Sequence, residues 1–313
     1  MDALTIRTYD QWEETALVLQ QILQMMGKTK LAYLEPQPQW GHILLDFTAG
    51  GFSTGLILEG PLGESSFSIE LSLRDRRVQA TRIDGRESGF TLRSGASIST
   101  YYQEFMQMLN EVLWETEIYT VPQEMALTTP FEKNNAPCDF DFVAAFDFLS
   151  LCVFAYKGIY RFLAPFRYKK FLPHFFWGTF DTTGALFSGK ESPWPYKGFI
   201  EAGAFDEQLM EFGFWPGDSM VKDPSFFVLA YPFPTRDYRQ VSLGPKGAVF
   251  SAEKSEFFLP VKDLLACNDP AAGLQEFFMT CYRLIVEDEK WPRALGEKPL
   301  LYGKGSRKAP QAG

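Results

Sequence analysis

Histidine, cysteine and positive charge are scarce in this chain of 313 residues. Its 30 Lys and Arg residues stand against 39 Asp and Glu, a net charge of −9 that repels phosphate, so we expect no nucleic-acid partner. The four cysteines form no CxxC pair, which argues against a zinc knuckle or a dense disulfide framework. With only two histidines, any imidazole chemistry is confined to two positions.

Targeting signals and membrane-length hydrophobic runs are also missing. Met1 to Thr5 show neither the basic nor the apolar region of a signal peptide, so we expect a cytoplasmic location. The longest apolar stretch, Phe142 to Tyr156, is interrupted by Asp147 and is shorter than the roughly 20 residues that cross a bilayer. We interpret it as a buried helix and expect no membrane partner. The apolar fraction of 46% is typical of a soluble globular protein.

The first part of the chain predicts a helix, an antiparallel meander and a second helix. Apolar residues recur at three- and four-residue steps from Asp10 to Met26 and again from Ile98 to Val112. Gly27 is the predicted end of the first helix. Between the helices, alternating segments predict strands, one of them Trp40 to Thr48, and Asp84-Gly85 predicts a hairpin turn.

The same order recurs after a polar linker rich in turn residues. A second helix is predicted from Asp141 to Tyr156, Gly158 is its predicted end, and a strand is predicted around His174. TAGGFSTG at 48–55 also faces TTGALFSG at 182–189. Because self-similarity of this kind indicates a repeat, we predict an α+β fold of two duplicated helix, antiparallel β-meander, helix units packed as two halves.

The predicted boundaries follow from composition. The first α+β repeat spans 1–121, the linker 122–137 and the second α+β repeat 138–296. The second repeat carries an insertion at 190–223 that is rich in glycine, proline and aromatic residues. Residues 297–313 have no apolar period and read as a flexible basic tail.

The two histidines, His42 and His174, fall at the same repeat position, near the start of the equivalent strand. If the halves pack about a pseudo-twofold axis, both imidazoles reach one cleft and act there as acid and base. Asp46 shares a strand face with His42, whereas Asp181 reaches the face of His174 only if a bulge near Gly178 shifts the alternation. The alternative is that each imidazole is a hydrogen-bonded structural residue that duplication copied.

These residues define the predicted site. The candidate catalytic residues, which also have the ligand count of a zinc site, are His42, His174, Asp46 and Asp181. No close-spaced ligand motif supports a metal, so we expect neither a metal nor a cofactor. The candidate ligand-binding residues are Lys30, Thr48, Arg161, Trp177, Trp215 and Asp218.

Two of these groups have a specific rationale. Lys30 and Arg161 recur near the predicted helix ends, where a cation either holds an anionic ligand or complements the helix dipole. Trp215 lies among glycine and proline in the run from Gly213 to Asp218, a composition typical of lids and ligand walls on irregular backbone.

Several motifs are similar to those of a known family. WGHILLDFTAGGFSTG and STYYQEFMQML in the first half, with PHFFWGTFDTTGALFSG and GFWPG in the second, resemble an uncharacterised, mainly bacterial family, domain-of-unknown-function family 5996. The resemblance runs from about Trp12 to about Trp291 and implies a soluble, single-unit protein without a known mechanism.

Together the patterns favour a soluble small-molecule-binding protein or an enzyme with a cleft between the repeats. That cleft is expected to use His42 and His174 and to take a small-molecule ligand. The alternative is a non-catalytic protein-interaction module.

Overall fold

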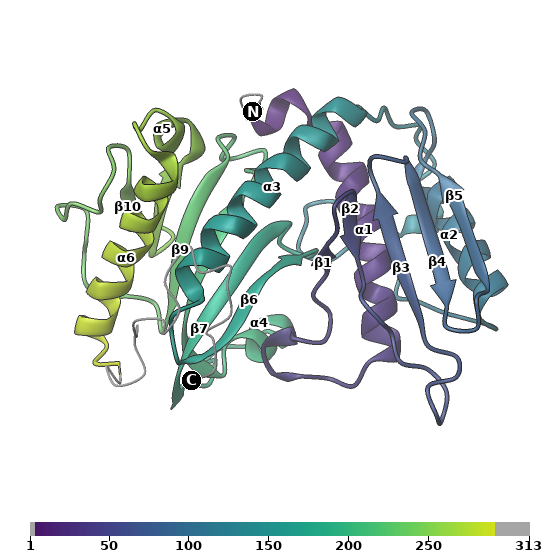
Figure 1. Ribbon diagram of the computed structural model, residues 1–313, viewed down its shortest axis with the longest axis horizontal. Helices are drawn as coiled ribbons and strands as arrows, with labels where there is room; N and C mark the ends of the chain where they lie inside the picture. The colour runs from purple at the N-terminus through teal and green to yellow at the C-terminus, as the bar shows by residue number, and fades with distance from the viewer. Residues whose placement is uncertain (1–3, 292–313) are drawn as a thin grey trace, which may run out of the picture.

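The computed structural model describes residues 4–291 and shows an α+β protein with two antiparallel sheets (Figure 1). The tail predicted at 297–313 lies outside the described residues. The helices are α1 (Glu13–Tyr33), α2 (Ile98–Val112), α3 (Phe142–Leu163), α4 (Phe199–Ala204), α5 (Val261–Leu265) and α6 (Pro270–Asp288). Short 3-10 turns lie at Tyr9–Gln11, Pro38–Trp40 and Phe131–Lys133.

The first sheet is a five-stranded meander that follows the chain in the order β1-β2-β3-β4-β5. Its strands are β1 (Asp46–Phe47), β2 (Gly51–Ser53), β3 (Phe67–Ser72), β4 (Arg77–Arg82) and β5 (Glu87–Thr91). The predicted hairpin is confirmed, since Asp84-Gly85 turns β4 into β5 with Gly85 at a φ of 89°. Along β3, buried residues alternate with more exposed ones, so one face packs on the core and the other meets solvent.

The second sheet has six strands in the order β10-β11-β9-β8-β7-β6. The strands are β6 (Lys169–Phe176), β7 (Asp181–Glu191), β8 (Glu207–Trp215), β9 (Ser225–Tyr231), β10 (Val249–Ser251) and β11 (Glu256–Pro260). The predicted insertion at 190–223 thus contributes α4 and a central strand of this sheet.

One face of the second sheet packs against α3 and α6, which lie in front of it in Figure 1. The Phe212 ring on β8 lies 4.6 Å from Phe162 on α3 and 5.4 Å from Phe278 on α6, measured between ring centroids. Because side chains alternate along a strand, the neighbouring residue Glu211 points to the opposite face. That opposite face carries the candidate site described below.

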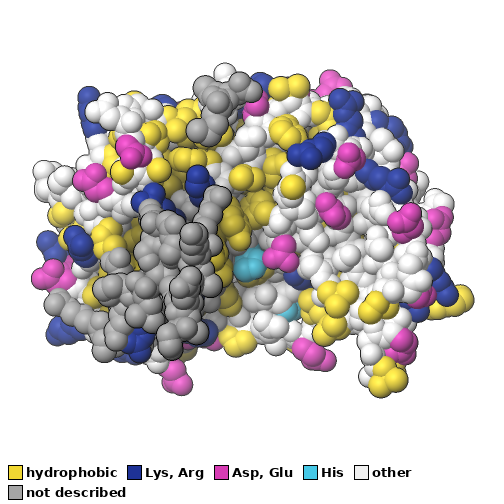
Figure 2. Space-filling model, in the orientation of Figure 1, with side chains coloured by type: hydrophobic (Ala, Val, Ile, Leu, Met, Phe, Trp, Pro, Cys, Tyr) yellow, Lys and Arg dark blue, Asp and Glu magenta, His cyan; other side chains and the backbone are white. Residues whose placement is uncertain are grey.

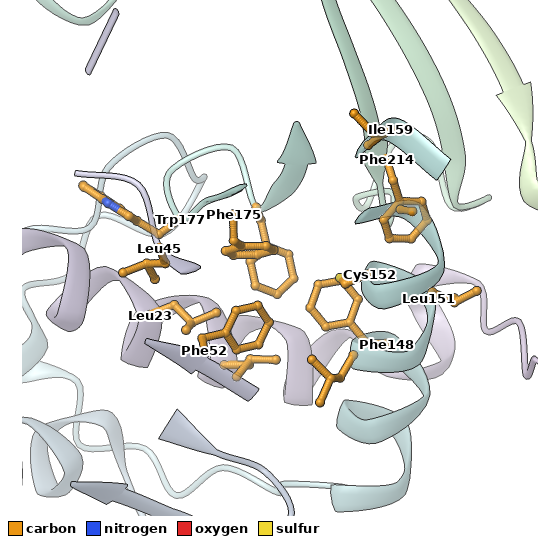
Figure 3. Packing of buried hydrophobic residues seen from close by; sticks show 14 of the residues in the cluster. Leu23, Leu45, Phe52, Phe148, Leu151, Cys152, Ile159, Phe175, Trp177 and Phe214 are labelled. Carbon is orange, nitrogen blue, oxygen red and sulfur yellow. The ribbon is translucent and has the colours of Figure 1, made fainter. Parts of the chain in front are cut away.

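A single hydrophobic core joins the two halves. Leu45 and Phe175 exchange backbone hydrogen bonds of 3.0 and 2.9 Å, which link the start of β1 to the end of β6. The Phe175 ring then lies 4.8 Å from Phe52 on β2 and 6.1 Å from Phe148 on α3 (Figure 3). Each half shows the predicted order of helix, sheet and helix, while the duplication itself stays a prediction.

The predicted ends of both long helices are wrong. Gly27 and Gly158 lie inside α1 and α3, because each glycine makes room for a packed side chain rather than ending the helix. A Cβ on Gly27 would lie 2.0 Å from Nε1 of Trp177, and one on Gly158 would lie 2.5 Å from Cδ2 of Leu274. The start of α3 agrees with the prediction, since the Asp141 carboxylate accepts hydrogen bonds from two backbone N–H groups of the first turn.

Two predicted strand features also need correction. The segment from Trp40 to Thr48 is irregular except for β1 at Asp46–Phe47, so His42 precedes a strand whereas His174 lies within one. Asp181 belongs to β7, after the turn that follows β6, and therefore does not share a strand with His174. A register shift does occur in β6, but between Phe171 and His174 rather than near Gly178.

Helix α3 is the one helix among residues 4–291 that is long and apolar enough to cross a membrane by length and composition. It packs on β6, β7 and β8 and against α6, and Cys152 and Leu163 on it are fully buried. Core helices of soluble proteins meet the same criterion, so α3 is weak evidence for a membrane span.

Candidate functional site

A cavity of about 480 Å³ lies on the face of the second sheet that is turned away from α3 and α6. Strands β7, β8, β9 and β11 form its floor, and α4, the turn at Pro38–Trp40, the end of α1 and the segment Gln123-Glu124 close it. It therefore lies where the first half, the linker and the second half meet. Its aromatic lining residues are Trp40, Phe171, Phe176, Trp177, Phe187, Phe199, Phe205, Trp215, Phe227 and Phe258.

Strand register places two carboxylates in one row across the floor. Glu211 on β8 pairs with Leu229 on β9, and the pairing of Phe257 with Val228 puts Glu256 on the other side of Leu229. The Cα atoms of the two glutamates are thus two strand spacings apart, or about 10 Å. Both side chains point into the cavity.

Three further carboxylates reach the cavity from other elements, one of them Glu201 on α4. Asp181 begins β7 and accepts hydrogen bonds from the hydroxyls of Thr179 and Thr183. Glu124 comes from the linker with a φ of 56°, an uncommon conformation for a residue other than glycine. A Cβ on Gly178 would lie 1.8 Å from a Glu124 carboxylate oxygen, so the glycine is what lets this carboxylate approach so closely.

The carboxylates of Asp181, Glu124, Glu211 and Glu256 have raised pKa values. Burial raises the pKa of Glu211 to about 8, with a further contribution from the charges of Asp181, Glu256 and Glu124. Burial likewise raises the pKa of Glu124 to about 7, that of Glu256 to about 7 and that of Asp181 to about 6. The Glu211 side chain keeps part of its surface accessible to solvent, and that part faces the cavity. Each group is therefore partly protonated near neutral pH.

Two buried lysines of α1 hold the walls of the cavity in place. Lys28 donates to the Val121 carbonyl at 2.8 Å and to the Gln123 side chain at 2.9 Å. Lys30 donates to the Leu44 carbonyl. Burial lowers the pKa of Lys28 to about 8 and also lowers that of Lys30. Since both cations bond to residues of the wall and neither lines the cavity, they position the wall.

Helix α4 covers one side of the cavity without burying any of its own residues. Trp40 from the first half holds it, because its indole N–H donates to the Ile200 carbonyl at 2.8 Å and its ring lies 5.3 Å from that of Phe199. The Trp40 ring also covers Gly203, where a Cβ would lie 2.7 Å away.

Three of the predicted site residues line this cavity: Trp177, Asp181 and Trp215. Trp215 does so from the end of β8, so the lid predicted on irregular backbone from Gly213 to Asp218 is wrong, and the covering segment is α4. Lys254 lies over the Trp215 ring, 5.4 Å from its centroid.

The other predicted residues lie elsewhere. Thr48 accepts a hydrogen bond from Gly50 in the turn between β1 and β2, and Asp218 accepts two backbone hydrogen bonds within its own turn. Arg161 is exposed in the last turn of α3, where it complements the helix dipole. Lys30 is buried behind the wall.

The histidines stand outside the cavity lining. His174 pairs with Asp46 across the two halves, with Nε2 3.3 Å from the carboxylate and Nδ1 2.7 Å from the Leu172 carbonyl. Figure 2, which views the molecule from the side of α3 and α6, shows a histidine beside an acidic side chain near the centre. His42 is buried; its Nδ1 accepts from the Gln37 N–H and its Nε2 has no partner among residues 4–291. Burial, and secondarily the charge of Lys30, lower the pKa of His42.

No group of three or more His, Cys, Asp or Glu side chains in the described part of the chain is arranged to hold a metal ion. The cavity carboxylates raise one another's pKa values, but no three of them converge on one point where they could ligate a metal ion. They therefore provide a diffuse negative field rather than a chelating site.

Sequence reasoning missed Glu124, Glu201, Glu211 and Glu256. Glu211 did leave a signal, because it is the one charged residue in the apolar run from Leu209 to Trp215. A lone carboxylate in such a strand has to face either solvent or a polar cavity. Glu124 left no signal, since its position depends on how the linker folds over Gly178.

The fold and the cavity define an α+β protein with an aromatic-walled, carboxylate-bearing cavity. The chain belongs to a family of unknown function (DUF5996), whose family model matches residues 5–298 and so confirms the resemblance found in the motifs. Neither the curated proteins nor the solved structures contain a match.

Proposed function

We propose that the protein binds a small organic molecule with an apolar body in the cavity between the second sheet and the first half. The observation that carries this proposal is an aromatic-walled cavity of about 480 Å³ with five carboxylates on its surface, those of Glu124, Asp181, Glu201, Glu211 and Glu256. Ligand sites are typically concave, mostly apolar and supplied with a few convergent polar groups. This proposal keeps the predicted cleft between the halves but moves the site from the histidines to the carboxylates.

Carboxylates with pKa values near neutrality favour a second candidate, acid–base catalysis on the bound molecule. The lining residues include no Ser, Cys or His within the described range, so Glu211 and Glu256 are the natural acid and base. A cytoplasmic location and the absence of nucleic-acid and membrane partners remain predictions, as does the interaction-module alternative.

A cavity-filling variant tests the proposal. Ala185 lies on the floor between Phe171 and Glu211, so Ala185→Phe places a ring inside the cavity. The matched control is Ala252→Phe, which adds the same ring at an exposed position. We expect at least one of 2-(1-naphthyl)ethylamine, 2-(1-naphthyl)ethanol and 1-naphthaleneacetate to bind the wild type and Ala252→Phe in calorimetric titrations. The same compound should bind Ala185→Phe at least tenfold more weakly.

Two outcomes would contradict the proposal. If none of the three compounds binds, or if all bind Ala185→Phe as tightly as the wild type, the cavity is not a ligand site. Thermal unfolding of each variant confirms that it is folded before the titrations are compared.

A further inference from the structure

We propose that the ligand of this cavity carries a protonated amine, which lies among Asp181, Glu211, Glu256 and Glu124 while its apolar body lies against the aromatic walls. This inference rests on the proposed function and specifies its ligand class. Three features of the cavity support it independently.

The first feature is that these carboxylates have no paired counter-ion among residues 4–291. In the described part of the chain none of these four carboxylates forms an ion pair, and Lys254 is the one cation that acts on any of them, at Glu256. Carboxylates enclosed by protein without a counter-ion destabilise the fold. A positively charged ligand supplies the missing counter-ion.

The second feature is the wall. Trp177 and Trp215 line the cavity beside Asp181, and Phe227 and Phe258 lie on the same floor as Glu211 and Glu256. The faces of aromatic rings carry partial negative charge and attract ammonium groups, most strongly where water is excluded. An anionic ligand would meet repulsion from both the rings and the carboxylates.

The third feature distinguishes an organic cation from a metal ion. No three of these carboxylates are arranged to ligate a metal ion, whereas the cavity has room for a molecule of many atoms. A divalent cation prefers six or more oxygen ligands at short distance, which this arrangement does not offer. An ammonium on an apolar skeleton fits both the spread of charge and the volume.

The matched naphthyl series tests the ligand class, because its members share one apolar body and differ in charge. We expect 2-(1-naphthyl)ethylamine to bind the wild type at least tenfold more tightly than 2-(1-naphthyl)ethanol at pH 8 and low salt, and 1-naphthaleneacetate to bind most weakly. The amine's affinity should rise from pH 6 to pH 8 as the carboxylates ionise, while the alcohol's affinity stays constant.

A charge variant tests whether the carboxylates on the cavity floor cause the preference for the amine over the alcohol. Glu211→Gln should remove most of the preference for the amine and change the alcohol's affinity less than threefold. The control Glu253→Gln removes the same charge from an exposed residue of the β10–β11 turn and should behave as the wild type. Calcium chloride at the same concentration should not compete with the amine.

The outcomes separate the two proposals. If the alcohol binds as tightly as the amine, or the acetate binds most tightly, or calcium displaces the amine, the ligand class is wrong while the cavity remains a binding site. If Glu211→Gln keeps the full amine preference, the carboxylate floor does not select the ligand. If no member of the series binds, both proposals fall.

Discussion

The two sheets follow the same order of flanking helices but differ in what covers them. In β3 of the first sheet, buried and exposed residues alternate, and the exposed side meets solvent. In β8 and β9 of the second sheet, most residues are buried and none is fully exposed, because helices cover one face and the cavity walls cover the other. A sheet covered on both faces reads as a continuous apolar run, so the polar residues within that run mark the site.

The two halves of the molecule contribute different parts of the cavity. The first half supplies the rigid parts that close the cavity, namely the end of α1 and the turn that bears Trp40. The second half supplies the floor and its carboxylates. The predictions below test this division of roles, starting with the joint between the halves.

The largest effect is expected at the joint between α1 and Trp177. Gly27→Ala places a Cβ about 2.0 Å from the indole, which is held by a 3.0 Å hydrogen bond from its N–H to the Ile43 carbonyl. The ring cannot move away without losing that bond, so we expect a loss of about 3 kcal/mol in the free energy of unfolding. Urea denaturation measures it.

Gly158→Ala on α3 is the matched control within the second half. Its Cβ meets the flexible end of Leu274. The higher helix propensity of alanine gives back about 1 kcal/mol, so the net change should be near zero. Equal losses in the free energy of unfolding for Gly27→Ala and Gly158→Ala would show that the contact between α1 and Trp177 contributes no more to stability than the contact within the second half.

Glu211→Gln is expected to raise the free energy of unfolding, by an amount that grows as pH rises from about 4 toward 8. The folded-state pKa of Glu211, about 8, lies above its unfolded value, so the folded protein holds a proton that the unfolded chain releases as pH rises. Stability is therefore unaffected below about pH 4, falls as pH rises toward 8 and stays low above it. After allowance for solvent in the cavity, the variant should gain on the order of 2 kcal/mol at pH 8.5 and nothing at pH 4.

Thermal unfolding at the two pH values checks this sign. Glu70→Gln on β3 is the matched change in the first sheet, where the carboxylate is exposed to solvent. It should show no such pH-dependent gain. A stabilised Glu70→Gln, or a Glu211→Gln that gains equally at both pH values, would contradict the contrast between the sheets.

The sequence predicted local features well and distant ones poorly. The α2 helix has the predicted limits, Ile98 and Val112, because its apolar period and the Ser97 cap are both local. Gly27 was misread as a helix end because the side chain that requires it, Trp177, lies 150 residues away in the chain. Asp181 was predicted from its position relative to His174, and Trp215 from the glycine and proline around it, but their meeting with Glu211 depends on the register of β7 and β8.

A smaller effect is expected from Trp40, the contact through which the first half holds α4. Trp40→Ala removes the hydrogen bond to Ile200 and the ring that covers Gly203. Because α4 has no buried residue of its own, we expect its backbone amides to exchange hydrogen faster by more than tenfold, with a loss of about 1 kcal/mol in global stability. Hydrogen–deuterium exchange of residues 199–204 measures the local effect, and unchanged protection there would show that α4 is held by the second half alone.

The smallest effect is expected at the pair that joins the sheets on the outside, Asp46 and His174. The hydrogen bond from His174 holds the pKa of Asp46 below its usual range, with burial opposing it and Lys30 adding to it. A lowered carboxylate pKa contributes stability that is present above about pH 4 and is lost as pH falls below it. Because half of the Asp46 side chain is exposed, Asp46→Asn should cost only about 0.5 kcal/mol at pH 6 and less at pH 3.

The same variant separates the predicted histidine site from the cavity. Asp46→Asn should leave the affinity for the naphthyl amine unchanged, since neither member of the pair lines the cavity. A tenfold loss of amine affinity in Asp46→Asn, with Glu211→Gln behaving as the wild type, would contradict the cavity as the binding site. It would show that the ligand binds at the imidazoles at the junction of the two sheets.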